Sequence, residues 1–208
     1  AEDNDSNIMI SSNGISWTKA TMLDGTSAFV KTGGGGGKAI VYDFTNSTWY
    51  AGGETDDEIN LLSSLNGDNW QKVNATVTNG SSFLPKGCYS LAYSLDKNAF
   101  IATGVSGGTE EENLLFTDTT LQNWTAASMS NGISFPFSNA NINGNEVAYS
   151  SDLKLWLAAG GALGDNLGGA LIYSTNGISW DVAKMSNGVS FPYGDKLDST
   201  GIAIATRN

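Results

Sequence analysis

An internal repeat is the feature that most constrains how this chain can fold. Residues 11–17 read Ser-Ser-Asn-Gly-Ile-Ser-Trp, residues 174–180 differ from them at one position, and residues 64–70 keep the serine, the Asn-Gly pair and the tryptophan. A looser copy at 117–124 lacks the Asn-Gly pair. The tryptophans that end the four copies are separated by 53, 54 and 56 residues: Trp17, Trp70, Trp124 and Trp180. A period of this length is typical of stacked structural units.

Two further motifs recur with the same period. One is a short turn with Asn-Gly or Asp-Gly, at 23–27, 78–83, 130–135 and 186–191, and the three prolines lie just after its last three copies: Pro85, Pro136 and Pro192. The other is an aromatic residue followed by alanine and glycine, at 49–53, 100–104 and 156–161. Three motifs in one order and at one spacing establish the repeat.

Each unit reads as four short strands. The first strands are 38–42, 89–93 and 146–149, the second carry the aromatic-alanine-glycine motif, the third are 59–63, 113–116 and 170–173, and the fourth begin near the four tryptophans. Asn-Gly between the third and fourth strands predicts a two-residue hairpin turn, because both residues tolerate positive φ. Four antiparallel strands per unit of about 54 residues indicate an all-β fold, a β-propeller of about four four-stranded blades.

The ends of the chain look like two parts of one unit. Residues 7–11 read as a third strand, whereas residues 201–206 fall near the position of a first strand. We therefore expect a single β-propeller domain over 1–208, with units at about 38–74, 89–126 and 145–182 and a composite unit of 199–208 plus 7–20. The last blade would be closed by the N- and C-terminal strands, which removes open sheet edges. The alternatives are a strand shared with a neighbouring chain at an open blade edge, and a longer array of which this chain is part.

The repeated turn resembles a motif of a known family. Ser-x-Asn-Gly-x-x-Trp is similar to a shortened Asp-box, the turn of the sialidase-like (BNR) β-propellers that is usually written Ser-x-Asp-x-Gly-x-x-Trp. The resemblance covers essentially the whole chain, with Asn where Asp is usual and with each turn one residue shorter. In that family the motif is a structural turn between the third and fourth strands of a blade. The resemblance thus implies a fold and not catalysis.

Composition excludes several kinds of chemistry. The net charge is −11, which disfavours nucleic acid, because phosphate backbones are bound by Lys and Arg. The chain has no histidine, and its single arginine is Arg207, so His-based metal sites and Ser-His-Asp systems are excluded. Sialidase activity, which the family performs with three arginines on the substrate carboxylate, is disfavoured. The lone Cys88 cannot form an internal disulfide and reads as a small buried apolar residue.

About half of the acidic residues fall in the loops between the second and third strands. Equivalent loops of a propeller emerge on one face, so that face should be negative. We favour a solvated rim, with a Ca²⁺ site and a surface for a basic partner as alternatives. No other cofactor is expected. The candidate cation ligands are Glu54, Asp56, Asp57, Glu58, Glu110, Glu111 and Glu112.

The tryptophans and the remaining acidic residues bear on two hypotheses, sugar binding and glycoside hydrolysis. All six tryptophans occupy repeat positions, which favours packing between blades over sugar stacking, and the less committed aromatic residues are Tyr50, Phe137 and Tyr193. A glycoside hydrolase needs two carboxylates, for which the candidates outside the acidic loops are Asp43, Asp96, Asp118 and Asp152. No unit shows an acid pair that breaks the repeat, so we assign no catalytic residue.

These observations predict a non-catalytic, extracellular binding or structural module, with glycans as one ligand class. The alternative is a carbohydrate-active enzyme that uses two carboxylates. No apolar run reaches the length of a membrane span, and we expect secretion or display at the cell surface. Partners would be a glycan, a protein, or further copies joined through an open blade edge. The best N-glycosylation acceptors are Asn46, Asn74 and Asn79, which lie in predicted turns.

Overall fold

The computed structural model describes residues 7–30, 35–105, 113–118, 121–132, 144–160 and 171–188. Within these ranges the chain forms strands, turns and loops, and it contains no helix. Accordingly, none of these residues belongs to a helix that could span a membrane. The predicted all-β class is confirmed.

Three sheets repeat one strand order. In each, four antiparallel strands follow one another in the sequence, and a short fifth strand pairs in parallel with the fourth. Sheet 1 contains β4 (Gly37–Asp43), β5 (Thr48–Gly53), β6 (Leu61–Ser64) and β7 (Asn69–Lys72). Sheet 2 contains β9 (Gly87–Ser94), β10 (Ala99–Val105), β11 (Leu114–Thr117) and β12 (Asn123–Ala126). Sheet 3 contains β14 (Gly144–Ser150), β15 (Leu155–Gly160), β16 (Leu171–Ser174) and β17 (Ser179–Val182).

The fifth strand of each sheet comes from the chain segment just before that sheet. These connector strands are β3 (Thr21–Met22) on β7, β8 (Thr76–Val77) on β12 and β13 (Ser128–Met129) on β17. After β2 (Thr18–Lys19), β7 and β12 the chain thus crosses to the outer edge of the next sheet and then enters its first strand. This crossing covers one edge of each sheet and was absent from the predicted strand pattern.

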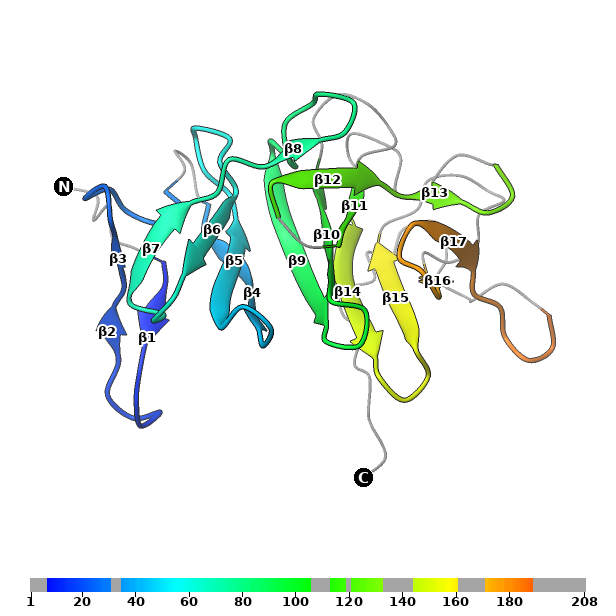
Figure 1. Ribbon diagram of the computed structural model, residues 1–208, viewed down its shortest axis with the longest axis horizontal. Helices are drawn as coiled ribbons and strands as arrows, with labels where there is room; N and C mark the ends of the chain where they lie inside the picture. The colour runs from blue at the N-terminus through cyan, green and yellow to red at the C-terminus, as the bar shows by residue number, and fades with distance from the viewer. Residues whose placement is uncertain are drawn as a thin grey trace.

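The N-terminal hairpin is half of a further unit. It pairs β1 (Met9–Ile10) with β2 (Thr18–Lys19), the counterparts of the third and fourth strands of the complete sheets. We predict that residues 199–208 complete this unit, and these residues lie outside the described ranges. Figure 1 shows this hairpin at one end of the long axis of the molecule and sheet 3 at the other.

The sheets pack side by side with their first strands innermost. The first strands β4, β9 and β14 are in contact between neighbouring sheets, which is the radial arrangement of propeller blades. Apolar residues fill each interface because successive side chains of a strand point to opposite faces. In β6, for example, Leu62 faces the N-terminal hairpin, whereas Leu61 faces sheet 2. The fold is therefore propeller-like, with three complete blade-like sheets among the described residues.

The repeated turn owes its shape to its own side chains. At 64–70 the Ser64 hydroxyl accepts the backbone N–H of Gly67 at 2.9 Å, and Asn66 Oδ1 accepts the N–H groups of Asp68 and Asn69 at 3.0 and 2.9 Å. The same scheme recurs at 11–17 and at 174–180. A short serine or asparagine side chain that accepts nearby backbone N–H groups stabilises a turn of this kind.

The predicted two-residue hairpin turn is wrong. Four residues, 65–68, separate β6 from β7, and within the Asn-Gly pair only Gly67 has a positive φ, of 76°. The asparagine acts through its side chain rather than through its backbone. In the looser copy Leu121 takes the glycine position with a φ of 40°, and its carbonyl still accepts the indole N–H of Trp124 at 2.8 Å.

Candidate binding site

The loop between β5 and β6 carries the four described acids of the expected acidic face. Glu54 is buried and its carboxylate lies 3.7 Å from Lys38, whereas Asp56, Asp57 and Glu58 are exposed. Burial, followed by the charge of Glu54, raises the pKa of Tyr89 above its ordinary value. Among the residues that the structure describes, no three His, Cys, Asp or Glu side chains form a group that could hold a metal ion. The other three candidate ligands lie outside the described residues: Glu110, Glu111 and Glu112.

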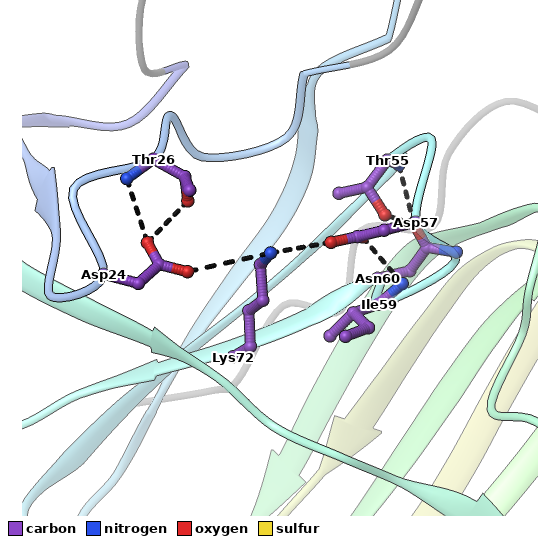
Figure 2. A network of polar contacts seen from close by, with 7 residues as sticks. All are labelled: Asp24, Thr26, Thr55, Asp57, Ile59, Asn60 and Lys72. Carbon is purple, nitrogen blue, oxygen red and sulfur yellow. Dashed lines mark hydrogen bonds and ion pairs between the residues drawn. The ribbon is translucent and has the colours of Figure 1, made fainter.

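Lys72 lies between two carboxylates that come from different loops. Its Nζ is 2.6 Å from Asp57 Oδ2 and 3.7 Å from Asp24 Oδ2 (Figure 2). Asp24 is fixed in turn by Thr26, whose backbone N–H and hydroxyl donate to Asp24 Oδ1 at 2.9 and 2.6 Å. The backbone N–H of Ile59 donates to Asp57 Oδ1 at 3.2 Å. One ammonium thus joins the turn after β3 to the β5–β6 loop.

The connector strand explains why these groups meet. Because β3 pairs in parallel with β7, with Thr21 opposite Asn69 and Met22 opposite Trp70, the turn at Asp24 comes beside the end of β7 at Lys72. The hydroxyl of Thr21 also donates to Asn69 Oδ1 at 3.0 Å. Sequence reasoning missed Asp24 and Lys72, because the pairing that joins them was not predicted.

The ion pair breaks the repeat. In the other complete sheets the counterparts of Lys72 are Ala126 and Val182, whereas the N-terminal hairpin has Lys19 at this position, opposite Met9. The counterparts of Asp24 in the Asn-Gly turns are Asn79, Asn131 and Asn187. This substitution was visible in the aligned repeats and would have been the signal for the site.

A pocket of about 460 Å³ lies against this ion pair. Its wall includes Lys72 and Asp57, the hydroxyl-bearing Thr26 and Thr55, and apolar side chains, among them Phe29. A few polar groups over an apolar wall are typical of small-molecule sites. The pocket lies between residues 22–30, which begin at the connector strand β3, and sheet 1 with its β5–β6 loop, since its lining residues come from these segments.

The charges at the pocket are held in their ionised forms. Partial burial acts to raise the pKa of Asp57, but hydrogen bonds from Lys72, Thr55 and the Ile59 N–H outweigh it and lower that pKa. Hydrogen bonds from the Thr26 hydroxyl and N–H lower the pKa of Asp24. The hydrogen bond to Asp57 raises the pKa of Lys72. Near neutral pH the pocket wall therefore carries the Lys72 cation and the Asp57 anion, and the Asp24 anion lies beside Lys72 outside the lining.

The four aspartates that were candidates for glycoside hydrolysis lie in surroundings different from this pocket. Asp43 is fully buried and accepts the N–H groups of Thr45 and Asn46 at 2.8 and 3.2 Å, which makes it a turn residue. Asp96 pairs with Lys154 at 2.6 Å. Asp118 and Asp152 are exposed. The structure groups none of these four in the pocket.

The tryptophans of the repeated turn differ sharply in burial. Trp70, Trp124 and Trp180 are buried between sheets, and each donates its indole N–H to the backbone carbonyl three residues earlier, at 2.8, 2.8 and 2.9 Å. Trp17 makes the same bond to Gly14 at 3.2 Å but is exposed. Tyr50 packs edge-on against Phe100 at a centroid distance of 5.4 Å.

The remaining expected positions are surface turns or lie outside the described residues. Asn46, Asn74 and Asn79 are all exposed. Asn46 donates its side-chain amide to Asp43, and Asn79 accepts the N–H of Ser81. Phe137 and Tyr193 lie outside the described residues.

Comparison with known proteins identifies no family for this chain. No family model matches the chain, and no curated protein matches it in sequence. Among solved structures, a β-fructofuranosidase from Schwanniomyces occidentalis in complex with fructosyl-erythritol is similar, with 11% identity and a TM-score of 0.44. The match covers 70% of this chain and 32% of that one, so the chain spans about a third of the length of that protein.

Proposed function

We propose that the chain is a non-catalytic binding module that takes a hydroxyl-rich ligand, a glycan, in the pocket beside Lys72. The observation that carries the proposal is the charged pair in the pocket wall, Lys72 and Asp57, with Asp24 bound to Lys72 from outside the lining. Vicinal sugar hydroxyls both donate and accept hydrogen bonds, so carboxylate acceptors around an ammonium donor match them. The apolar wall, in which Val30 is partly exposed, would lie against the carbon face of a sugar ring.

Ionisation of both acids argues for binding over hydrolysis. A glycosidase needs one protonated carboxylic acid with a raised pKa to donate to the leaving oxygen. At this site the pKa values of Asp24 and Asp57 are both lowered. The pair therefore lacks the proton donor, and a hydrolase remains the alternative that an assay must address.

A glycan array followed by calorimetry on the bound glycan tests the proposal. Lys72→Met keeps an unbranched side chain that is one atom shorter and removes its charge, and we expect it to weaken binding at least tenfold. The matched control is Lys154→Met, which breaks an ion pair of the same 2.6 Å length, with Asp96, away from the pocket. Absence of any glycan ligand, or equal binding by Lys72→Met and wild type, would contradict the proposal.

The hydrolase alternative predicts turnover. A panel of glycosidase substrates should give no product with the wild-type chain. Product formation that is abolished by Asp57→Asn would overturn the binding module in favour of the enzyme.

We also propose that the module acts outside the cell and belongs with the Asp-box propellers. The serine, asparagine and tryptophan bonds of the turn at 64–70 support the family resemblance. The exposure of Asn46, Asn74 and Asn79 supports their use as glycan acceptors. Expression through a eukaryotic secretory pathway, with mass measurement before and after endoglycosidase treatment, tests the glycan positions.

A further inference from the structure

The N-terminal hairpin exposes two side chains whose counterparts are buried in every complete sheet. Met9 is 45% exposed and Trp17 is 56% exposed. Register identifies the counterparts, because Met9 pairs with Lys19 as Leu62 pairs with Lys72. The three counterpart pairs are Leu62 with Trp70, Leu115 with Trp124 and Ile172 with Trp180, and each of these side chains is at most 1% exposed.

Each buried counterpart pair packs against the unit before it. Leu115 and Trp124 share a core with Leu61 of sheet 1, and Ile172 and Trp180 share a core with Ile101 of sheet 2. Leu62 and Trp70 pack on the N-terminal hairpin itself. Met9 and Trp17 therefore occupy the positions that, in the complete sheets, pack against the preceding unit. We call this surface the Trp17 face.

The opposite end of the molecule carries the other half of that interface. In sheet 3 the residues Leu157 and Tyr173 pair across β15 and β16, as Ile101 and Phe116 pair across β10 and β11. Ile101 and Phe116 pack against sheet 3, whereas Leu157 and Tyr173 remain partly exposed. They line a hollow of about 690 Å³ together with Leu155 and Val182. We call this surface the Tyr173 face.

The segment after β17 that corresponds in sequence to the connector strands extends the Tyr173 face. Lys184 and Met185 follow β17 as Ser128 and Met129 follow β12. In the complete sheets Met22, Val77 and Met129 lie opposite Trp70, Trp124 and Trp180 respectively. The same register would place Met185 opposite Trp17 and Lys184 opposite Ser16. Met185 is only partly buried, whereas its counterparts Met22, Val77 and Met129 are buried.

We propose that the Trp17 face of one molecule docks on the Tyr173 face of a second copy of this chain. The N-terminal hairpin, which carries the Trp17 face, and sheet 3, which carries the Tyr173 face, lie at opposite ends of the long axis of the molecule, so a second copy can pack against either face (Figure 1). The contact continues the interface that already joins sheets 1, 2 and 3. It is heterologous, which means that copies join head to tail into a closed ring or an open chain.

Two variants, each with one cysteine added to the native Cys88, test the register. Thr21 and Asn69, at the position equivalent to Lys184 and Ser16, contact each other through their side chains at 3.0 Å, and Cα atoms of facing strand residues are close enough for a disulfide. An equimolar mixture of Ser16→Cys and Lys184→Cys should give a disulfide-linked dimer on mild oxidation. Neither variant alone should do so beyond a trace, because Cys88 is fully buried and does not compete.

The double variant Ser16→Cys/Lys184→Cys shows whether the Trp17 face meets the Tyr173 face of a second copy or that of its own chain. Head-to-tail association gives a ladder of linked dimers and larger species. A linked monomer as the sole product would show that the two ends of one chain meet, and it would overturn the proposal. The absence of any link in the mixture and in the double variant would do the same.

Sedimentation velocity tests the apolar contact. Trp17→Ser should raise the concentration needed for association at least tenfold, because the anchor of the Trp17 face is removed. The control is Ile15→Ser in the same turn, where the side chain is 84% exposed and its counterpart Ile178 is also exposed. Wild-type protein that stays monomeric across the micromolar range, or equal association by Trp17→Ser and wild type, would contradict the proposal.

Discussion

The indole N–H of Trp70 donates a 2.8 Å hydrogen bond to the carbonyl oxygen of Gly67 inside the core between the N-terminal hairpin and sheet 1. The bond satisfies the polar atom of an otherwise apolar side chain, which allows the whole ring to be buried. It also fixes the ring relative to the turn that carries it. The repeated turn is therefore both a hairpin connection and an anchor for the interface between units.

The side chain of Asn66 should be essential to that turn, whereas its amide nitrogen should not. Asn66→Ala removes the acceptor of two backbone N–H groups and should lower the free energy of unfolding by about 1–3 kcal/mol. Asn66→Asp keeps the acceptor oxygen and should cost less. Urea unfolding of both variants measures the difference, with Leu65→Ala, at an 80% exposed position, as the control. Equal destabilisation by Ala and Asp would contradict the assigned role of Oδ1.

The close approach of β5 to β9 should show as coupling between Gly52 and Cys88. A Cβ atom on Gly52 would lie 2.6 Å from Cys88 Sγ, so Gly52→Ala should destabilise the fold by about 1–3 kcal/mol. Cys88→Ala removes the sulfur and should relieve part of that cost. A double-mutant cycle from denaturant unfolding measures the coupling, which we expect to exceed about 0.5 kcal/mol. Additive effects would mean that the backbone shifts to accept the new methyl group.

The burial of Cys88 should make its thiol a reporter of global unfolding. The side chain is completely buried, and this burial raises the pKa of the thiol well above its ordinary value. Because the thiolate is the reactive form, alkylation should be negligible in native buffer and rapid in denaturant. Labelling with iodoacetamide followed by mass measurement checks this. Fast labelling of the native protein would contradict the packing between sheets 1 and 2.

The repeated turns could be predicted from the sequence. The ion pairs at Lys72 could not, because they depend on the crossing of the chain between sheets. The turn at 64–70 has a local cause, since its serine, asparagine and tryptophan bond within seven residues, so its three copies could be recognised in the sequence. Asp24 and Lys72 meet only because β3 pairs in parallel with β7. The sequence reading placed four strands in each unit and left no fifth strand to bring these residues together. The burial of Trp70 and the exposure of Trp17 likewise depend on what stands next to each unit, which the motif itself does not encode.

Calcium should leave the stability of the fold unchanged. Of the described acids in the β5–β6 loop, Glu54 lies beside Lys38 and Asp57 beside Lys72, so a cation would have to displace existing ion pairs. Thermal unfolding at matched ionic strength should give one midpoint with calcium, with magnesium and with chelator. A midpoint of thermal unfolding that rises with calcium alone would contradict this prediction and support a Ca²⁺ site on the acidic face.

The network around Lys72 should contribute most to stability in the neutral range. The pKa values of Asp24 and Asp57 are lowered in the folded state, so the stability they contribute is present above their unfolded pKa, about 3.9, and is lost as the pH falls through the folded values. The pKa of Lys72 is raised, so its contribution is present below its unfolded pKa, about 10.4, and is lost as the pH rises through the folded value. Denaturant unfolding of wild type and Lys72→Met should therefore differ by a constant amount between about pH 5 and pH 9 and converge in acid and in strong base. A difference that persists unchanged from pH 7 to pH 2 would show that Lys72 acts through the packing of its methylene stem and not through its charge.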